Sequence, residues 1–379
     1  MTDWTALVRP PLVGLDPYRP GPTLSELKRE HGVDEIAKLN WNEDLFGPLP
    51  GALEAVECEL PNAWMYPEQA YADLRTAVAE WIGTSPEHIV PGHGIQALIG
   101  TVARVFLRDG DRVVLPSPTY GLYAQISAVA GASVVPVPCR DFRLDLAALA
   151  AAARAHDARL VWVCDPNNPT GSLVERGDWE RFLDHLPEAT VAVVDEAYRE
   201  YVDPPRRLER ERDVEAGRRV VLLRTFSKIF GLAGLRLGYA VCARDVATYL
   251  DVVQEPFNVN RAALAAGRAC LAHPERIEER RRVSADARTH LECLLAKRGF
   301  TVFHSQANFV LVHLGADDVE VCERLVRRGL LLRAGSEFGL PGYVRVTVGP
   351  RPLMERAAAA LADVTAELVG RDAVTKIAR

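Results

Sequence analysis

Short apolar runs rich in valine and leucine alternate with segments of helical spacing through the middle of the chain. From about residue 68 turns and charged residues bound these runs, which read DRVVLP, SVVPVP, RLVWVC, TVAVV, RVVLL and LGYAVC. Near-continuous apolar strands separated by helices are typical of a parallel sheet that is covered on both faces. The pattern therefore predicts an α/β fold, in which helices flank a mostly parallel sheet in a large domain.

After about residue 245 the pattern changes. A long charged segment has the composition of a helix and leads into shorter apolar runs, which read TVF, ANFVLVH, LLLR and YVRVTV. Residues 1–35 form a proline-rich arm with a short amphipathic helix near Leu24–His31. We expect this arm to join the C-terminal α+β unit. The large domain would then comprise residues 36–255, and the smaller domain residues 1–35 and 256–379.

Composition and charge narrow the classes of protein. A chain of 379 residues suits two domains, and 48% hydrophobic with 25% charged residues is ordinary for a soluble globular protein. The net charge of −6 gives no support for nucleic-acid binding, and no apolar run approaches the length of a membrane span. Seven cysteines without a CxxC pair suit a reducing cytosol, and nine histidines show no metal-binding spacing. We expect a cytoplasmic protein without a metal site.

Polar residues follow three of the predicted strands. Asn168 comes after RLVWVC, Asp195 directly follows TVAVV, and Lys228 comes after RVVLL. In open α/β sheets ligands bind at the carboxyl ends of the strands. A lysine that can form a Schiff base and an aspartate that can pair with a protonated pyridine are the two groups that pyridoxal phosphate needs most. The sequence therefore predicts a pyridoxal 5′-phosphate site at this edge of the sheet.

Two further features suit the phosphate of such a cofactor. A glycine turn, Gly92–Gly94, opens a predicted helix, and Arg236 lies eight residues after Lys228. Backbone amides at the start of a helix bind phosphate well. Tyr120, at the end of another strand, is either a core aromatic or a ring that stacks on a flat cofactor.

Each of these residues also has an ordinary explanation. Lys228 could be a solvated surface residue, Asp195 a helix cap, Asn168 a turn former and Arg236 one half of a surface ion pair. Their arrival at the ends of neighbouring strands, in this order, favours a binding site over these separate explanations.

Two arginines are candidates for binding a substrate anion. In YVRVTV the valines alternate, so that Arg345 lies on the other face of the strand. It is either exposed to solvent or binds a carboxylate, which suits the planar fork of its guanidinium. Arg333, at the end of LLLR, is a weaker candidate of the same kind.

Motifs along nearly the whole chain resemble those of the fold type I pyridoxal-phosphate aminotransferases of class I/II, and they read VGLDPYRPG, NWNEDLFGP, MYPEQAYADLR, PSPTYGLY, DPNNPTG, VVDEAYREY, TFSKIFGLAGLRLGY, PFNVN and YVRVTVG. Within this family, VGLDPYRPG and PFNVN are similar to the histidinol-phosphate aminotransferase group. The resemblance implies an aspartate-aminotransferase-like fold with a large cofactor-binding domain. It also implies transfer of an amino group between a donor, L-histidinol phosphate, and 2-oxoglutarate or glutamate, as in histidine biosynthesis.

The resemblance also implies roles for individual residues around the cofactor. Lys228 would form the Schiff base, and Asp195 would keep the pyridine nitrogen protonated. Tyr198 and Asn168 would donate hydrogen bonds to the ring oxygen, and Tyr120 would stack on the ring. The cofactor phosphate would be bound by side chains and backbone amides of Thr225, Ser227, Arg236, Gly94, Ile95 and Gln96.

Four further residues would bind substrate or reach across a subunit boundary. Arg345 would take the carboxylate of glutamate or 2-oxoglutarate, while Tyr18 and Arg333 would face the substrate phosphate. Tyr66 would reach the cofactor phosphate of the neighbouring subunit, which implies a homodimer.

The chain departs from the family pattern at three places, which we expect to bear on the substrate. The family usually reads Asn-Glu-Asn-Pro at Asn42–Leu45, Ser or Ala and then Asp at Ile95 and Gln96, and Asp at Ala334. These departures leave open an aromatic or other amino-acid aminotransferase. A decarboxylase of a phosphorylated amino acid also remains open, whereas a transcription regulator would need a DNA-binding domain before the aminotransferase-like part.

Overall fold

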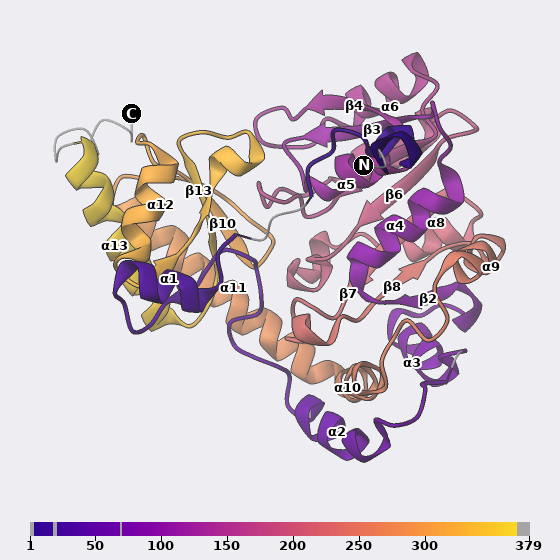
Figure 1. Ribbon diagram of the computed structural model, residues 1–379, viewed down its shortest axis with the longest axis horizontal. Coiled ribbons are helices and arrows are strands. Elements are labelled where there is room, and N and C mark those ends of the chain that lie inside the picture. Colours follow the sequence, from indigo (N-terminus) through magenta and orange to yellow (C-terminus); the bar gives the residue numbers. More distant parts are fainter. Residues whose placement is uncertain (1–3, 18–20, 69, 370–379) are drawn as a thin grey trace.

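A computed structural model describes residues 4–17, 21–68 and 70–369. One half of the molecule is built on a seven-stranded sheet in the order β2-β8-β7-β6-β5-β3-β4 (Figure 1). The bounds of its strands are β2 (Ile89–Gly92), β3 (Arg112–Ser117), β4 (Ser133–Pro138), β5 (Leu160–Cys164), β6 (Val191–Asp195), β7 (Val220–Thr225) and β8 (Gly238–Val241).

The predicted strand pattern is confirmed for this sheet. Strands β4, β3, β5, β6 and β7 pair in parallel, and only β8 runs antiparallel to its neighbours β7 and β2. Every residue of β5, β6 and β7 is buried. A strand that is covered on both faces cannot alternate polar and apolar residues, which is why these segments read as continuous apolar runs.

Helices surround this sheet and supply the rest of its core. In α4 the residues Ile95, Leu98, Ile99 and Val102 are buried, which is the spacing of one helical face. The alanine-rich tract forms a helix whose first turn is capped by the side chain of Asp145. The helices of this half are α2 (Ala52–Glu59), α3 (Ala72–Ile82), α4 (Gly94–Phe106), α5 (Leu122–Val129), α6 (Leu146–Ala155), α7 (Arg176–His185), α8 (Glu211–Glu215), α9 (Arg244–Val253) and α10 (Arg261–Leu271).

The other half contains a four-stranded antiparallel sheet in the order β12-β13-β10-β9. Its own core joins apolar residues from the strands and from three helices, in the orange and yellow part of Figure 1. The bounds of these elements are β9 (Thr301–Phe303), β10 (Phe309–His313), β12 (Arg333–Ala334), β13 (Tyr343–Thr347), α11 (Pro274–Lys297), α12 (Asp318–Val326) and α13 (Arg351–Val369).

The N-terminal segment packs on this second half from α1 onward, whereas the turn at Pro10–Leu12 lies against α5 of the first half. Helix α1 (Leu24–His31) buries Leu27 in a small cluster with Ile36 and Val326. Strand β1 (Ala37–Lys38) then pairs in parallel with β11 (Leu330–Leu331). The run LLLR is therefore not one strand, because β11 pairs with β1 whereas β12 pairs with β13.

Short 3-10 turns complete the chain at Trp4–Leu7, Pro10–Leu12, Leu60–Asn62, Pro86–His88, Arg199–Tyr201, Pro204–Arg206, Ala233–Leu235 and Gly335–Phe338. Helix α11 runs between the two halves in Figure 1. The division at residues 35 and 255 stays a prediction. In the described part of the chain, no helix combines the length and the apolar character that crossing a membrane requires.

Candidate active site

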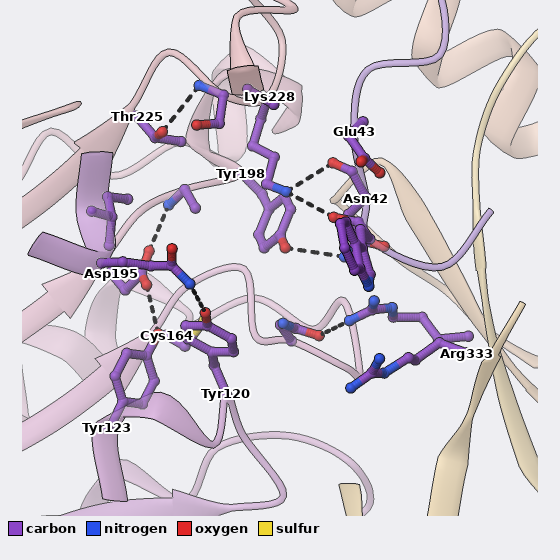
Figure 2. A pocket seen from close by; sticks show the side chains of 18 of the residues that line it. Asn42, Glu43, Tyr120, Tyr123, Cys164, Asp195, Tyr198, Thr225, Lys228 and Arg333 are labelled. Carbon is purple, nitrogen blue, oxygen red and sulfur yellow. Dashed lines mark hydrogen bonds between the residues drawn. The ribbon is translucent and has the colours of Figure 1, made fainter. Parts of the chain in front are cut away.

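A pocket of about 500 Å³ lies between the carboxyl ends of the large sheet and the edge of the small sheet. We call it the central pocket. Its walls come from segments far apart in the sequence, as Figure 2 shows for eighteen of its side chains. The residues singled out from the sequence that line it are Ile95, Gln96, Tyr120, Asn168, Asp195, Tyr198, Thr225, Ser227, Lys228, Arg236, Arg333 and Arg345.

Lys228 stands just after β7 and directs its amine into the central pocket (Figure 2). The amine Nζ donates to the backbone oxygens of Asn42 at 2.9 Å and Trp41 at 3.1 Å. Burial lowers the pKa of Lys228 to about 8, although the carboxylate of Glu43 opposes this effect. An amine with such a pKa is partly neutral near neutral pH, so it can act as a nucleophile or a base.

Asp195 ends β6, and its side chain is buried. Tyr123 donates its hydroxyl to Oδ2 of Asp195 at 2.7 Å, and the backbone N–H of Ala197 donates to Oδ1 at 3.0 Å. Burial raises the pKa of Asp195 to about 6, against the opposing effect of these two hydrogen bonds and of Lys228. A carboxylate accepts more than two hydrogen bonds, so Asp195 can also pair with a protonated ring nitrogen.

Arg345 is buried, so the alternative of a solvent-exposed arginine is wrong. Its Nη1 donates to Oδ1 of Asn168 at 2.6 Å, and its Nη2 donates to the backbone oxygen of Asn40. Its Nε has no hydrogen-bond partner among the described residues. Burial lowers the pKa of Arg345 to about 10. A desolvated guanidinium with an unused donor suits an anionic ligand.

A cradle for a phosphate lies at the start of α4. Gly94 has φ +76°, and a Cβ atom at this position would lie 2.7 Å from Nη2 of Arg236. The glycine therefore lets the guanidinium approach the amides of the first helical turn. The backbone N–H of Ser227 donates to Oγ1 of Thr225 at 3.0 Å, and Nη1 of Arg236 donates to Oγ of Ser227 at 3.5 Å, so both hydroxyls line the pocket beside this turn. Hydroxyls, a guanidinium and helix amides together suit a phosphate dianion.

Two of the described residues proposed from the resemblance, Gly94 and Tyr66, do not line the central pocket. The backbone of Gly94 adjoins it through Arg236, as described above. Tyr66 lies elsewhere, with 79% of its surface exposed, and stacks on Phe257 at a ring distance of 4.8 Å. Tyr18 lies outside the described residues.

The departures from the family pattern fall into two groups. Ile95 and Gln96 line the central pocket, and Gln96 donates its side-chain amide to the hydroxyl of Tyr120 at 3.0 Å. Asp44 is buried instead beside Arg280, which donates to it at 2.7 Å. Neither Asp44 nor its neighbour Leu45 lines the pocket, and Ala334 does not either. We therefore correct the expectation that all the departures bear on the substrate.

Several residues that line the central pocket were not proposed from the sequence, namely Trp41, Asn42, Glu43, Tyr123, Cys164, Ala197, Ala233, Gly234 and Phe338. Tyr123 carried a signal, because it lies three residues after Tyr120 on the helix that follows the same strand. Asn42 had none as a partner of Lys228, because 186 residues separate the two in the chain.

The chemistry of the central pocket fits pyridoxal 5′-phosphate. An amine, a buried carboxylate and a phosphate cradle match the aldehyde, the ring nitrogen and the phosphate of that molecule. The described residues contain no group of three or more histidine, cysteine, aspartate or glutamate side chains that could hold a metal ion.

Comparisons with known proteins agree with this chemistry. The family described as aminotransferase class I and II matches residues 34–361 of the chain. A histidinol-phosphate aminotransferase of Symbiobacterium thermophilum is 38% identical over 342 residues, which cover 90% of this chain and 94% of that protein. Another, of Moorella thermoacetica, is 36% identical and covers 94% of this chain and 93% of its own.

A solved structure shows the same fold. The histidinol-phosphate aminotransferase of Sinorhizobium meliloti, solved in complex with pyridoxal-5′-phosphate, superposes with a TM-score of 0.88. It is 32% identical in sequence, and the match covers 95% of this chain and 98% of that one.

Proposed function

Because the chain belongs to the aminotransferase class I and II family, we propose that it transfers an amino group between L-histidinol phosphate and 2-oxoglutarate, with pyridoxal 5′-phosphate as its cofactor. The observation that carries this proposal is the central pocket itself. It brings the amine of Lys228 and the carboxylate of Asp195 into one cavity with the guanidiniums of Arg333 and Arg345. The choice of L-histidinol phosphate as the amino donor, as in histidine biosynthesis, rests on the relatives named above.

The cofactor, when bound, supplies an aldehyde that links covalently to amines and a protonated ring that withdraws electrons. In our proposal Lys228 holds the aldehyde and Asp195 holds the ring nitrogen. Asn168 and Tyr198 bind the ring oxygen, and Tyr120 packs against the ring. The phosphate is held by Thr225, Ser227, Arg236 and the amides of Gly94, Ile95 and Gln96.

Lys228 has a second task once the amino donor is bound. Its amine Nζ takes a proton from the α-carbon of the donor, because its lowered pKa of about 8 leaves part of the population unprotonated near neutrality. The backbone oxygens of Trp41 and Asn42 accept hydrogen bonds from this amine and hold it at one place. Asp195 stabilises positive charge on the ring throughout the reaction.

Two cationic side chains form the substrate end of the pocket. Arg345 and Arg333 lie 5.0 and 5.9 Å from the ring of Phe338, measured from the guanidinium carbon to the ring centre. In our proposal Arg345 binds the carboxylate of 2-oxoglutarate, and Arg333 and Tyr18 bind the phosphate of histidinol phosphate. Arg333 is partly exposed and pairs with Glu337 at 2.7 Å, so a phosphate would compete with a weak surface ion pair.

An aromatic amino acid is the second candidate donor. Trp41 lines the central pocket with 41% of its surface exposed, and Phe338 lines the pocket as well. An aromatic ring would find apolar contact on both, whereas a phosphate ester would use the guanidiniums.

We further propose a homodimer in the cytoplasm, in which Tyr66 reaches the cofactor phosphate of the partner subunit. The exposed fractions of Leu60, Trp64 and Tyr66 are 56%, 82% and 79%, and Phe257 beside them is 39% exposed. Such an apolar cluster suits burial against a second copy of the chain. The cysteines of the described residues are unpaired, which suits a reducing compartment. Sedimentation of the wild type and of Trp64→Glu checks the dimer, which we expect the charge to weaken.

A donor screen tests the proposed function. The purified protein loaded with cofactor is offered 2-oxoglutarate with histidinol phosphate, phenylalanine, tyrosine or leucine, and glutamate formation is measured. We expect kcat/KM to be highest for histidinol phosphate. A higher value for phenylalanine or tyrosine would favour the second candidate, and carbon dioxide release without a need for 2-oxoglutarate would point to a decarboxylase.

A further inference from the structure

A buried network of charged side chains lies beside the central pocket without lining it. Its members are at most 9% exposed, and they are Asp165, Glu196, Arg199, Arg210, Glu211 and Arg224. Three carboxylates face three guanidiniums, so the network carries no net charge. Burial of charges is costly unless they are paired, and a chain can replace such a network with apolar residues at little loss of stability. This set therefore calls for an explanation other than stability.

Arg210 joins two parts of the network. Its Nη1 donates to Oε1 of Glu196 at 2.7 Å, and its Nη2 donates to Oδ2 of Asp165. Arg224 holds the other oxygen of Glu196, with 2.8 Å from Nε to Oε2. It also donates through Nη1 to Glu211 at 2.7 Å.

Three strand ends that carry proposed cofactor residues, those of β5, β6 and β7, also carry a member of the network. Asp165 directly follows β5 and precedes Asn168 by three residues, and Glu196 directly follows Asp195. Arg224 directly precedes Thr225 on β7. Successive side chains of a strand point to opposite faces. The network therefore ties the strand ends together from the side of the sheet opposite to the one that presents the pocket residues.

Arg210 itself belongs to none of these strands. It precedes α8, and its guanidinium lies 4.5 Å from the ring of Trp179. The strand ends are paired by backbone hydrogen bonds in which Arg210 takes no part. One of them joins the N–H of Asp165 to the backbone oxygen of Asp195 at 2.9 Å. Loss of its guanidinium would therefore leave the sheet paired. It would also leave Asp165 without its cation at the start of the segment that carries Asn168.

We propose that Arg210 is a positioning residue for the cofactor ring: it fixes the segment of Asn168 relative to that of Asp195 by binding Asp165 and Glu196 together. This inference rests on the proposed function, because it concerns the same site. The two side chains that would hold the ring oxygen and the ring nitrogen lie on different strands. A shift of about 1 Å between such groups can lower a rate by on the order of 100-fold.

The test compares Arg210→Met and Arg210→Lys with the wild type. Asp165→Asn serves as a gentler variant, because the amide keeps the size of the carboxylate but loses its charge. Arg288→Met is the matched control. Arg288 is equally buried, at 3% exposed, donates to the backbone oxygen of Ala307 at 3.1 Å, and does not line the central pocket. Three properties are measured for each protein, namely the Kd of pyridoxal 5′-phosphate by absorbance, the steady-state kinetics of amino transfer, and unfolding of the cofactor-free form.

We expect Arg210→Met to raise the Kd and to lower kcat by about ten-fold or more each, while the Michaelis constant for the oxo-acid acceptor changes less than kcat. Arg210→Lys should recover part of the loss, since an ammonium can keep one of the two ion pairs. The control should lose stability but keep its Kd and kcat within about two-fold of the wild type.

Two results would overturn the proposal. One is an Arg210→Met protein that loses stability alone, with unchanged Kd and kcat. If that variant does not fold, Asp165→Asn decides, and unchanged Kd and kcat in it would be equally decisive. A wild-type protein that binds no pyridoxal 5′-phosphate would refute the proposed function instead, which keeps the two failures apart.

Discussion

Removal of one oxygen atom, in Tyr123→Phe, should shift the pH at which the protein binds its proposed cofactor. The hydroxyl of Tyr123 donates to Asp195 at 2.7 Å, and its ring stacks on Trp162 with 7° between the planes. Phenylalanine keeps the stacked ring and removes only the donor. The substitution therefore changes the environment of the carboxylate with little effect on packing.

The size of the shift follows from the hydrogen bond. A hydrogen bond to a charged group contributes about 1.5–3 kcal/mol, which corresponds to about one to two pKa units. This bond lowers the pKa of Asp195, which burial holds at about 6. Its loss should raise that pKa to roughly 7 or 8. The ionised carboxylate, which pairs with a cationic ring, disappears as the pH falls through its pKa. The variant should therefore lose affinity at a higher pH than the wild type.

The assay is a titration of cofactor-free protein with pyridoxal 5′-phosphate at a series of pH values. The free cofactor titrates identically in both experiments, so the displacement between the two curves reports the protein. Tyr201→Phe is the control, because Tyr201 donates to the buried carboxylate of Asp44 at 3.0 Å and does not line the central pocket. Coincident curves for Tyr123→Phe and the wild type would refute the reasoning, as would an equal displacement in the control.

Two further predictions concern single residues. Lys228→Ala should reduce turnover to below a few per cent and abolish borohydride labelling of the chain, since no other amine would take its place; labelling at another lysine would contradict this. Arg280→Met should lower the free energy of unfolding by about 3–5 kcal/mol near neutral pH, because it leaves Asp44 buried without its cation. Denaturant unfolding measures this loss, which should shrink at low pH as Asp44 takes up a proton; a loss below about 1 kcal/mol would show that the pair is not needed.

Part of the fold follows from short-range pattern. The runs that form β5, β6 and β7 are recognisable in the sequence, because strands buried on both faces are apolar along most of their length and carry polar residues only near their carboxyl ends. The same pattern predicts that Asp195 and Lys228 come to one edge, because parallel strands share their carboxyl ends.

Other parts could not be predicted from local pattern. The run LLLR is apolar up to its final arginine, yet only its pairing partners decide that it divides into β11 and β12. Asp44 looks like a change at the substrate until Arg280, 236 residues later in the chain, is seen beside it. Arg345 could have faced solvent or substrate by strand alternation alone, and its contact with Asn168 shows that it faces the pocket.

By itself the sequence determined the buried strands of the large sheet, the polar residues that follow them and the cofactor chemistry that those residues can support. Only the tertiary structure decided which long-range contacts form. The backbone oxygen of Asn42 accepts from the amine of Lys228, the hydroxyl of Tyr123 lowers the pKa of Asp195, and Arg210 binds the carboxylates that follow two strands. Secondary structure depends on side chains a few residues apart, whose spacing is visible in the chain. Long-range partners are set by the packing of whole elements, and no pattern in either local segment indicates which distant residue will be the partner.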